Sequence, residues 1–71
     1  MDFKIGDIIK FNHLTPNPTY HGEVGKIVKH DKYSNQPYYV VMFKSKFPNS
    51  NCKPEWFYLL KSPEYLNNNK L

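Results

Sequence analysis

The stretch YHGEVGKIVKHDKYSNQPYYVVMF, residues Tyr20 to Phe43, contains two strand-like segments and the connection between them. In residues 24–30, Lys26 and Lys29 flank Ile27 and Val28, and residues 38–43 are apolar, β-branched or aromatic throughout. Both patterns predict strands. We expect Gly22 to end the preceding loop in a left-handed conformation. Gly25 lies inside the first strand, where glycine is typical of a bulge or a close backbone approach.

Two further segments, Ile8 to Phe11 and Trp56 to Leu60, also have strand-like patterns, and proline-bearing connections separate all four. Ser62 and Pro63 are typical of a helix start, which predicts one helical turn from Pro63 to Leu66. The sequence therefore predicts an all-β fold of four to five bent antiparallel strands with one short helical turn near the C-terminus. We expect a single domain over residues 1–66 and a disordered tail over residues 67–71.

Lysine supplies all ten basic residues of this 71-residue chain, against six acidic residues, and the formal net charge is +4. A basic balance favours an acidic partner such as nucleic acid. Because bidentate reading of guanine edges is mainly done by arginine, the absence of arginine disfavours a sequence-specific reader of the major groove. The abundance of Lys, Asn, Ile and Tyr indicates an A/T-rich genome, such as that of a phage or a low-GC bacterium.

Cys52 is the only cysteine, so no disulfide can form within the chain and a reducing compartment is favoured. No run approaches the roughly 20 apolar residues of a membrane span. The first residues, MDFKIGD, lack the apolar core of a signal peptide. We therefore expect a cytoplasmic protein that has no membrane partner.

Three motifs resemble the KOW-like branch of the SH3-like barrels: IGDIIKF (residues 5–11), GEVGKIV (residues 22–28) and YVVMF (residues 39–43). Members of that group begin with G-D-x-V, continue with G-x-x-G-x-V/I-V, and then carry a strand ending in a hydrophobic pair. The resemblance implies a small, strongly bent SH3-like barrel over roughly residues 3 to 60. It also implies binding to nucleic acid or to protein, without enzymatic activity, through the loops and the exposed barrel face.

Residues suited to catalysis or metal binding show no functional spacing. His13, His21, His30 and Cys52 are scattered through the chain, without the C-x-x-C or H-x-x-x-H spacing of a zinc site. No serine or cysteine lies in a recognisable nucleophile motif. We therefore predict that the protein is not an enzyme and has no metal, no cofactor and no small-molecule substrate.

Lysines interleaved with aromatic residues predict a binding site for nucleic acid or a nucleoprotein complex, because ammonium groups bind phosphates and rings stack on bases. The candidate residues lie in three connections and at their borders, which we expect to converge beside one edge of the barrel: Tyr20, His21, Lys29, Lys32, Tyr33, Lys44, Lys46, Phe47 and Lys53. We assign Lys4, Lys10, Lys61 and Lys70 to a solvated surface.

An alternative partner is a protein, because the third and fourth predicted strands are apolar on both faces. A small barrel buries one face of each strand, so the residues on the other are either exposed or covered by loops. The candidates for a protein interface or a homodimer contact are Tyr38, Met42, Trp56 and Tyr58. In this alternative the protein is a modulator or inhibitor of a host complex.

Overall fold

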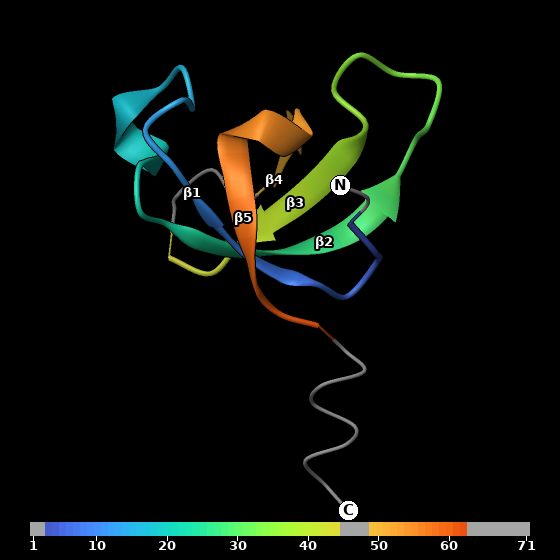
Figure 1. Ribbon diagram of the computed structural model, residues 1–71, viewed down its shortest axis with the longest axis horizontal. Helices are drawn as coiled ribbons and strands as arrows, with labels where there is room; N and C mark the ends of the chain where they lie inside the picture. Colours follow the sequence, from blue (N-terminus) through green and yellow to red (C-terminus); the bar gives the residue numbers. More distant parts are fainter. Residues whose placement is uncertain (1–2, 45–48, 63–71) are drawn as a thin grey trace, which may run out of the picture.

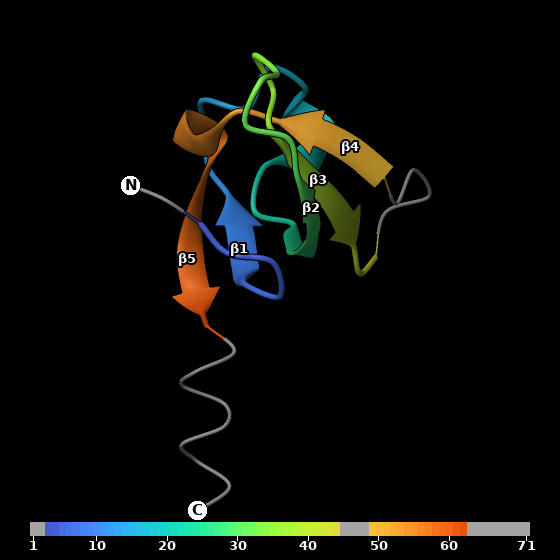
Figure 2. The ribbon, with the colours of Figure 1, turned by 90° about the vertical axis from the view of Figure 1, so that its right-hand side faces the viewer.

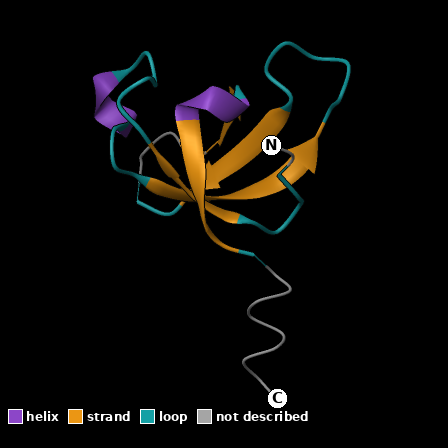
Figure 3. Ribbon diagram, in the orientation of Figure 1, coloured by secondary structure: helices purple, strands orange, loops and turns teal. Residues whose placement is uncertain are grey.

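The computed structural model describes residues 3–44 and 49–62. Five strands and two short 3₁₀ helices follow one another along the chain: β1 (Ile8–Phe11), η1 (Pro18–Tyr20), β2 (Val24–His30), β3 (Tyr38–Met42), β4 (Asn49–Cys52), η2 (Pro54–Trp56) and β5 (Phe57–Lys61). Strands dominate the described chain, with loops between them (Figure 3). The prediction of an all-β fold with four to five antiparallel strands is confirmed.

The strands form one antiparallel sheet in the order β4-β3-β2-β1-β5, so that β4 and β5 are its edges (Figures 1 and 2). Register irregularities fall between Ile8 and Ile9 in the β1–β5 pair and between Ile27 and Lys29 in the β2–β3 pair. Such irregularities bend a strand and increase its twist. The sheet is therefore strongly curved around the core. Closure of this curved sheet into a barrel stays a prediction.

Aromatic rings fill the space inside the curved sheet. The ring of Phe57 on β5 lies 4.7 Å from that of Phe3 and 5.8 Å from those of Phe11 and Tyr38, between centroids. Since Tyr38 belongs to β3, its contact with Phe57 joins two strands that are not neighbours in the sheet. The full buried hydrophobic cluster comprises Phe3, Ile9, Phe11, Ile27, Tyr38, Val40, Met42, Cys52 and Phe57.

The two glycines of the β2 region have the roles predicted for them. Gly22 has a φ of +79°, which places it in the left-handed region. Gly25 is buried, and a Cβ atom at this position would lie 2.6 Å from Val40 Cγ1 and 3.0 Å from the Val41 carbonyl oxygen. Gly25 is therefore required by the close approach of β3. The strand irregularity lies further along β2, at Ile27 to Lys29.

Several predicted boundaries differ from the structure. Strand β3 ends at Met42, and Trp56 belongs to η2. The segment Asn49–Cys52, expected to be part of a connection, is an edge strand paired with β3. The predicted helical turn at Pro63 to Leu66 and the predicted tail at residues 67–71 lie outside the described residues.

The single cysteine of the chain is buried. Cys52 is 1% exposed and belongs to the core, so its expected position in a loop is wrong. It is buried because it lies opposite Tyr38 on the inner side of the sheet.

Within residues 3–44 and 49–62, no helix is long and apolar enough to cross a membrane.

Candidate functional site

The outer side of the sheet carries a row of lysines set by the strand register. Ile8 on β1 lies opposite Lys26 of β2 and opposite Lys61 of β5. Residues directly opposite in antiparallel strands project from the same side of the sheet. Ile9, the next residue along β1, is fully buried, so Ile8 and its two partners project outward. Lys26 and Lys61 are therefore two strand positions apart on one face, at roughly 10 Å.

The remaining strand lysines lie on the same outer side. Lys10 follows Ile8 by two positions and lies opposite Tyr58 of β5. Lys29 lies opposite Tyr39, which alternates with the buried residues Tyr38 and Val40. We call this surface the basic face and define it by Lys10, Lys26, Lys29, Lys61, Tyr39 and Tyr58. Lys26, Lys29 and Lys61 are exposed and Lys10 is half-buried.

No acidic residue offsets these charges within the sheet, because none of the five described strands contains Asp or Glu. The acidic residues of the described chain, Asp7, Glu23, Asp31 and Glu55, lie in turns, in loops or in η2. Asp7 is 3% exposed and its Oδ2 accepts a hydrogen bond from the Lys4 amide at 2.8 Å. The outer side of the sheet therefore carries positive charge only, which favours an anionic partner.

A second basic and aromatic region lies where three connecting segments gather at one end of the molecule. Figure 1 shows η2 between the loop that carries η1 and the loop of residues 31–37, and Figure 2 shows all three at the same end of the molecule. The ammonium group of Lys53 lies 6.0 Å from the centroid of the Trp56 ring, and that of Lys32 lies 5.5 Å from the Tyr33 ring. Both separations are in the range of cation–π contacts. We call this region the loop end and define it by Tyr20, Lys32, Tyr33, Lys53 and Trp56.

Hydrogen bonds fix the η1 loop against η2. The side-chain amide of Asn12 donates a hydrogen bond to the Glu55 carbonyl at 2.9 Å, and the backbone N–H of Asn12 donates one to the Trp56 carbonyl at 2.8 Å. The Thr15 hydroxyl donates to the same Trp56 carbonyl at 2.9 Å. Three hydrogen bonds between segments so distant in the sequence therefore hold the η1 loop and η2 together without a ligand.

The candidate residues of the predicted nucleic-acid site are only partly brought together. Tyr20 packs against the core and contacts Phe11, while the imidazole Nε2 of His21 lies 2.7 Å from the Thr15 carbonyl oxygen. Tyr33 is 87% exposed. Tyr20, Lys32, Tyr33 and Lys53 lie at the loop end, and Lys29 lies on the basic face. Lys46 and Phe47 lie outside the described residues.

Lys44 is separated from the other loop lysines, so the predicted convergence of the three connections is wrong at this residue. The amide of Phe43 donates to the Val24 carbonyl, which places Lys44 at the start of β2. Lys32 follows the other end of this seven-residue strand. The strand length separates the two lysines by roughly 20 Å.

Two of the predicted protein-interface residues are core residues. Tyr38 and Met42 are each 3% exposed, because the curved sheet turns this side of β3 inward. The Tyr38 hydroxyl also accepts a hydrogen bond from the Phe3 amide at 3.2 Å. Their assignment to an exposed interface is therefore wrong. Trp56 is half-buried against the core, and Tyr58 is exposed as predicted.

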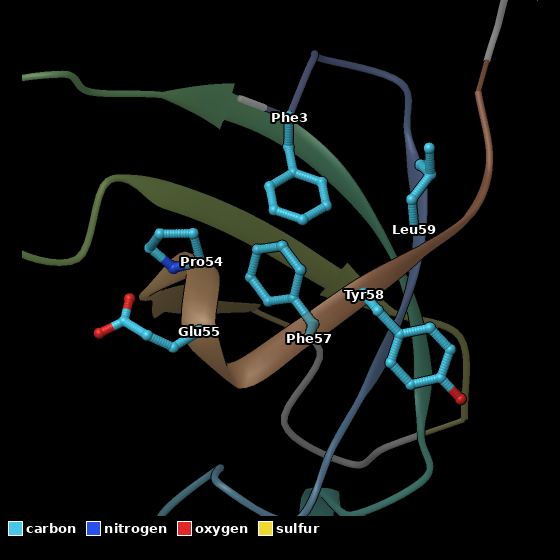
Figure 4. A pocket seen from close by; sticks show the side chains of 6 residues that line it. All are labelled: Phe3, Pro54, Glu55, Phe57, Tyr58 and Leu59. Carbon is cyan, nitrogen blue, oxygen red and sulfur yellow. The ribbon is translucent and has the colours of Figure 1, made fainter. Parts of the chain in front are cut away.

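Strand β5 presents an apolar edge. Tyr58, Leu59 and Leu60 are 47%, 41% and 44% exposed. A shallow depression of about 600 Å³ lies beside them, where the rings of Phe3 and Phe57 face each other and Tyr58 turns away (Figure 4). An exposed edge strand can pair with a strand of another chain. We call this surface the β5 edge.

Sequence reasoning missed three lysines of the basic face: Lys10 and Lys61 were assigned to a solvated surface, and Lys26 was not among the candidates. Alternation with Ile9 and Phe11 shows that Lys10 points away from the core, but only strand register places it beside Tyr58.

Within the described part of the chain, no group of three or more His, Cys, Asp or Glu residues lies close enough together to hold a metal ion.

No protein-family model matches this chain, and neither the curated proteins nor the solved structures contain a match to it.

Proposed function

We propose that this protein is a non-catalytic module that binds single-stranded nucleic acid, alone or within a nucleoprotein complex, through the basic face. The observation that carries the proposal is the gathering of all four strand lysines on one side of a sheet whose strands contain no acidic residue. Ammonium groups at this spacing can each contact a phosphate, and release of the bound counterions drives the association.

A single strand is favoured over a duplex by the residues between the lysines. Tyr58 is 47% exposed beside Lys10, and Tyr39 is half-buried beside Lys29. Exposed rings stack on unpaired bases, whereas the bases of a duplex are stacked on each other. The chain has no arginine to read guanine edges in a major groove. The resemblance to KOW-like SH3-like barrels supports the same class of function.

The test is a titration of a fluorescently labelled single-stranded oligonucleotide at several salt concentrations. We expect binding that weakens steeply between roughly 50 and 200 mM salt. If the four strand lysines each contact one phosphate, the logarithm of the association constant should fall with that of salt with a slope of about −3. A duplex of the same sequence should bind more weakly. Absence of binding to any single strand at low salt would refute the proposal.

A second candidate function is protein binding at the β5 edge, which the exposure of Tyr58, Leu59 and Leu60 favours. The partner would add a strand beside β5 and cover the depression at Phe3 and Phe57. A homodimer formed through this edge, or a complex with a host protein, would have an affinity that depends little on salt.

A reducing, cytoplasmic location is also proposed, because Cys52 is the only cysteine and is buried. The origin from a phage or a low-GC bacterium remains a prediction from composition, and so does the absence of enzymatic activity.

A further inference from the structure

A small pocket lies at the loop end, between the η1 loop, the loop of residues 31–37 and η2. Its volume is about 170 Å³. Aromatic and proline rings form much of its lining, from Phe11, Pro16, Tyr20 and Trp56, and amide residues border it at Gln36 and Asn51. Flat apolar walls next to hydrogen-bonding groups fit a flat, polar-edged ring.

The pocket is built before a ligand binds. The hydrogen bonds from Asn12 and Thr15 to the carbonyls of Glu55 and Trp56 hold the η1 loop against η2. The ring of Tyr20 lies 6.1 Å from that of Phe11, between centroids, and so is held against the core. A pre-formed site loses little conformational entropy when it binds its ligand.

The two amides at the border are available to a ligand. Gln36 and Asn51 are exposed, and neither side chain makes a hydrogen bond within the described part of the chain. Each amide offers a donor next to an acceptor. Every unpaired base presents a complementary donor and acceptor on its edge, and adenine is the usual base that Asn and Gln side chains bind through two hydrogen bonds. A purely apolar ligand would leave these amide groups without partners.

The pocket and the basic face meet around the edge strand β4: Phe11 and Cys52 line the pocket from the inner side of the sheet, and Asn51 borders it from the outer side. Asn51 lies opposite Tyr39 in the β3–β4 pair, and Tyr39 lies opposite Lys29 in the β2–β3 pair. On the other side of the pocket, the ammonium group of Lys53 lies over the Trp56 ring. Lys53 therefore lies beside a base in the pocket, and Lys29 lies two strand spacings, roughly 10 Å, from Asn51.

We infer that this pocket holds one unstacked base, with adenine preferred, of the single strand whose phosphates lie on the basic face. The inference rests on the proposed function and adds a base-binding subsite to it. The rings of Tyr20 and Trp56 contact the faces of the base, and the amides of Gln36 and Asn51 bind its edge. The lysines hold the strand without regard to sequence, and the pocket adds a preference for adenine.

Trp56 is the only tryptophan, so its fluorescence reports directly on the pocket. Four probes separate the two surfaces: free adenosine, which tests the pocket alone; an abasic hexanucleotide, which tests the basic face alone; and oligo(dA) and oligo(dT) hexanucleotides, which test both. We expect adenosine and oligo(dA) to quench Trp56. The abasic strand should bind, with detection by competition against a labelled strand, without a comparable change in fluorescence.

The matched variants are Gln36→Ala combined with Asn51→Ala, and Asn35→Ala as a control in the same loop that does not line the pocket. The double variant should weaken binding of oligo(dA) by about tenfold and remove its advantage over oligo(dT). Binding of the abasic strand should not change in either variant. Circular dichroism of each variant checks that the fold is retained.

Equal affinity for the oligo(dA) and abasic strands, with no response of Trp56 to adenosine, would overturn the inference and leave the proposed function standing. Unchanged oligo(dA) binding in the folded double variant would also overturn it. If none of the three hexanucleotides bound at low salt, the proposed function would fail, and with it the assignment of the pocket to a base of a bound strand.

Discussion

Gly25→Val is expected to remove much of the stability of the fold and to lower its denaturation midpoint markedly. The first added carbon would lie 2.6 Å from Val40 Cγ1 and 3.0 Å from the Val41 carbonyl oxygen, and Val40 is itself fully buried. Overpacking of this kind costs typically 1 to 3 kcal/mol and occasionally more. The core of so small a domain supplies only about 3 to 5 kcal/mol of stability. Urea denaturation, followed by Trp56 fluorescence and circular dichroism, measures the loss.

Gly22→Ala is the matched control, because a Cβ atom there would meet nothing within 4 Å. Its cost comes only from the left-handed backbone at a φ of +79°, and we expect about 1 to 2 kcal/mol. The valine variant should therefore be the more damaging of the two. A denaturation midpoint of Gly25→Val close to that of the wild type would show that β3 does not approach β2 as described.

Replacing Lys10, Lys26, Lys29 and Lys61 together with glutamine is expected to reduce binding of single-stranded nucleic acid below detection at physiological salt. All four side chains project from the outer side of the sheet, and none belongs to the core. The fold should therefore survive the change. Each lost phosphate contact should reduce the salt slope by about 0.7 units. A fluorescence titration of a labelled oligonucleotide at several salt concentrations measures both effects.

The matched control replaces Lys4, Lys32, Lys44 and Lys70 with glutamine, which lowers the net charge by the same amount and leaves the basic face intact. It should keep most of the salt slope, with a modest loss of affinity from the weaker long-range attraction. Since Lys32 and Lys44 belong to the connections first expected to bind nucleic acid, the comparison also tests that expectation. Equal losses in the two quadruple variants would mean that net charge, and not the basic face, determines binding.

The sequence predicted the strands that have an apolar pattern of their own. Ile8–Phe11 alternates in burial, Val24–His30 carries Ile27 and Val28 between two lysines, and β3 is apolar throughout. Strand β4, Asn-Ser-Asn-Cys, has no such pattern, because its place in the sheet comes from backbone pairing with β3. A polar edge strand of this kind cannot be distinguished from a loop by composition.

The inner and outer sides of β3 also could not be assigned from sequence alone. Tyr38, Val40 and Met42 form one side and Tyr39 and Val41 the other, and both sides are apolar. The choice depends on the curvature of the sheet, which brings Phe57 of β5 against Tyr38. For this reason the residues first considered for an interface include two that are buried in the core.

The basic face illustrates what sequence reasoning lacks at a binding site. Lys10 and Lys61 lie near opposite ends of the chain and share a surface only because β1 pairs with β5. The irregularity between Ile8 and Ile9 decides that Lys61, and not Leu60, lies opposite Ile8. A shift of one residue would move the lysine to the other side of the sheet. Lysines interleaved with aromatic residues therefore predicted a nucleic-acid site from the sequence, but the predicted site was assigned to the loops.

Mapping of backbone amide shifts by nuclear magnetic resonance, during titration with a single-stranded oligonucleotide at low salt, tests the central claim most directly. The basic face predicts the largest changes at strand residues across the outer side of the sheet, including Lys10, Lys26 and Tyr39. The turn that contains Ile5, which carries no residue of the basic face, should change little. No changes on the sheet, or changes confined to Leu59, Leu60 and the neighbouring Phe3 on the β5 edge, would contradict the account.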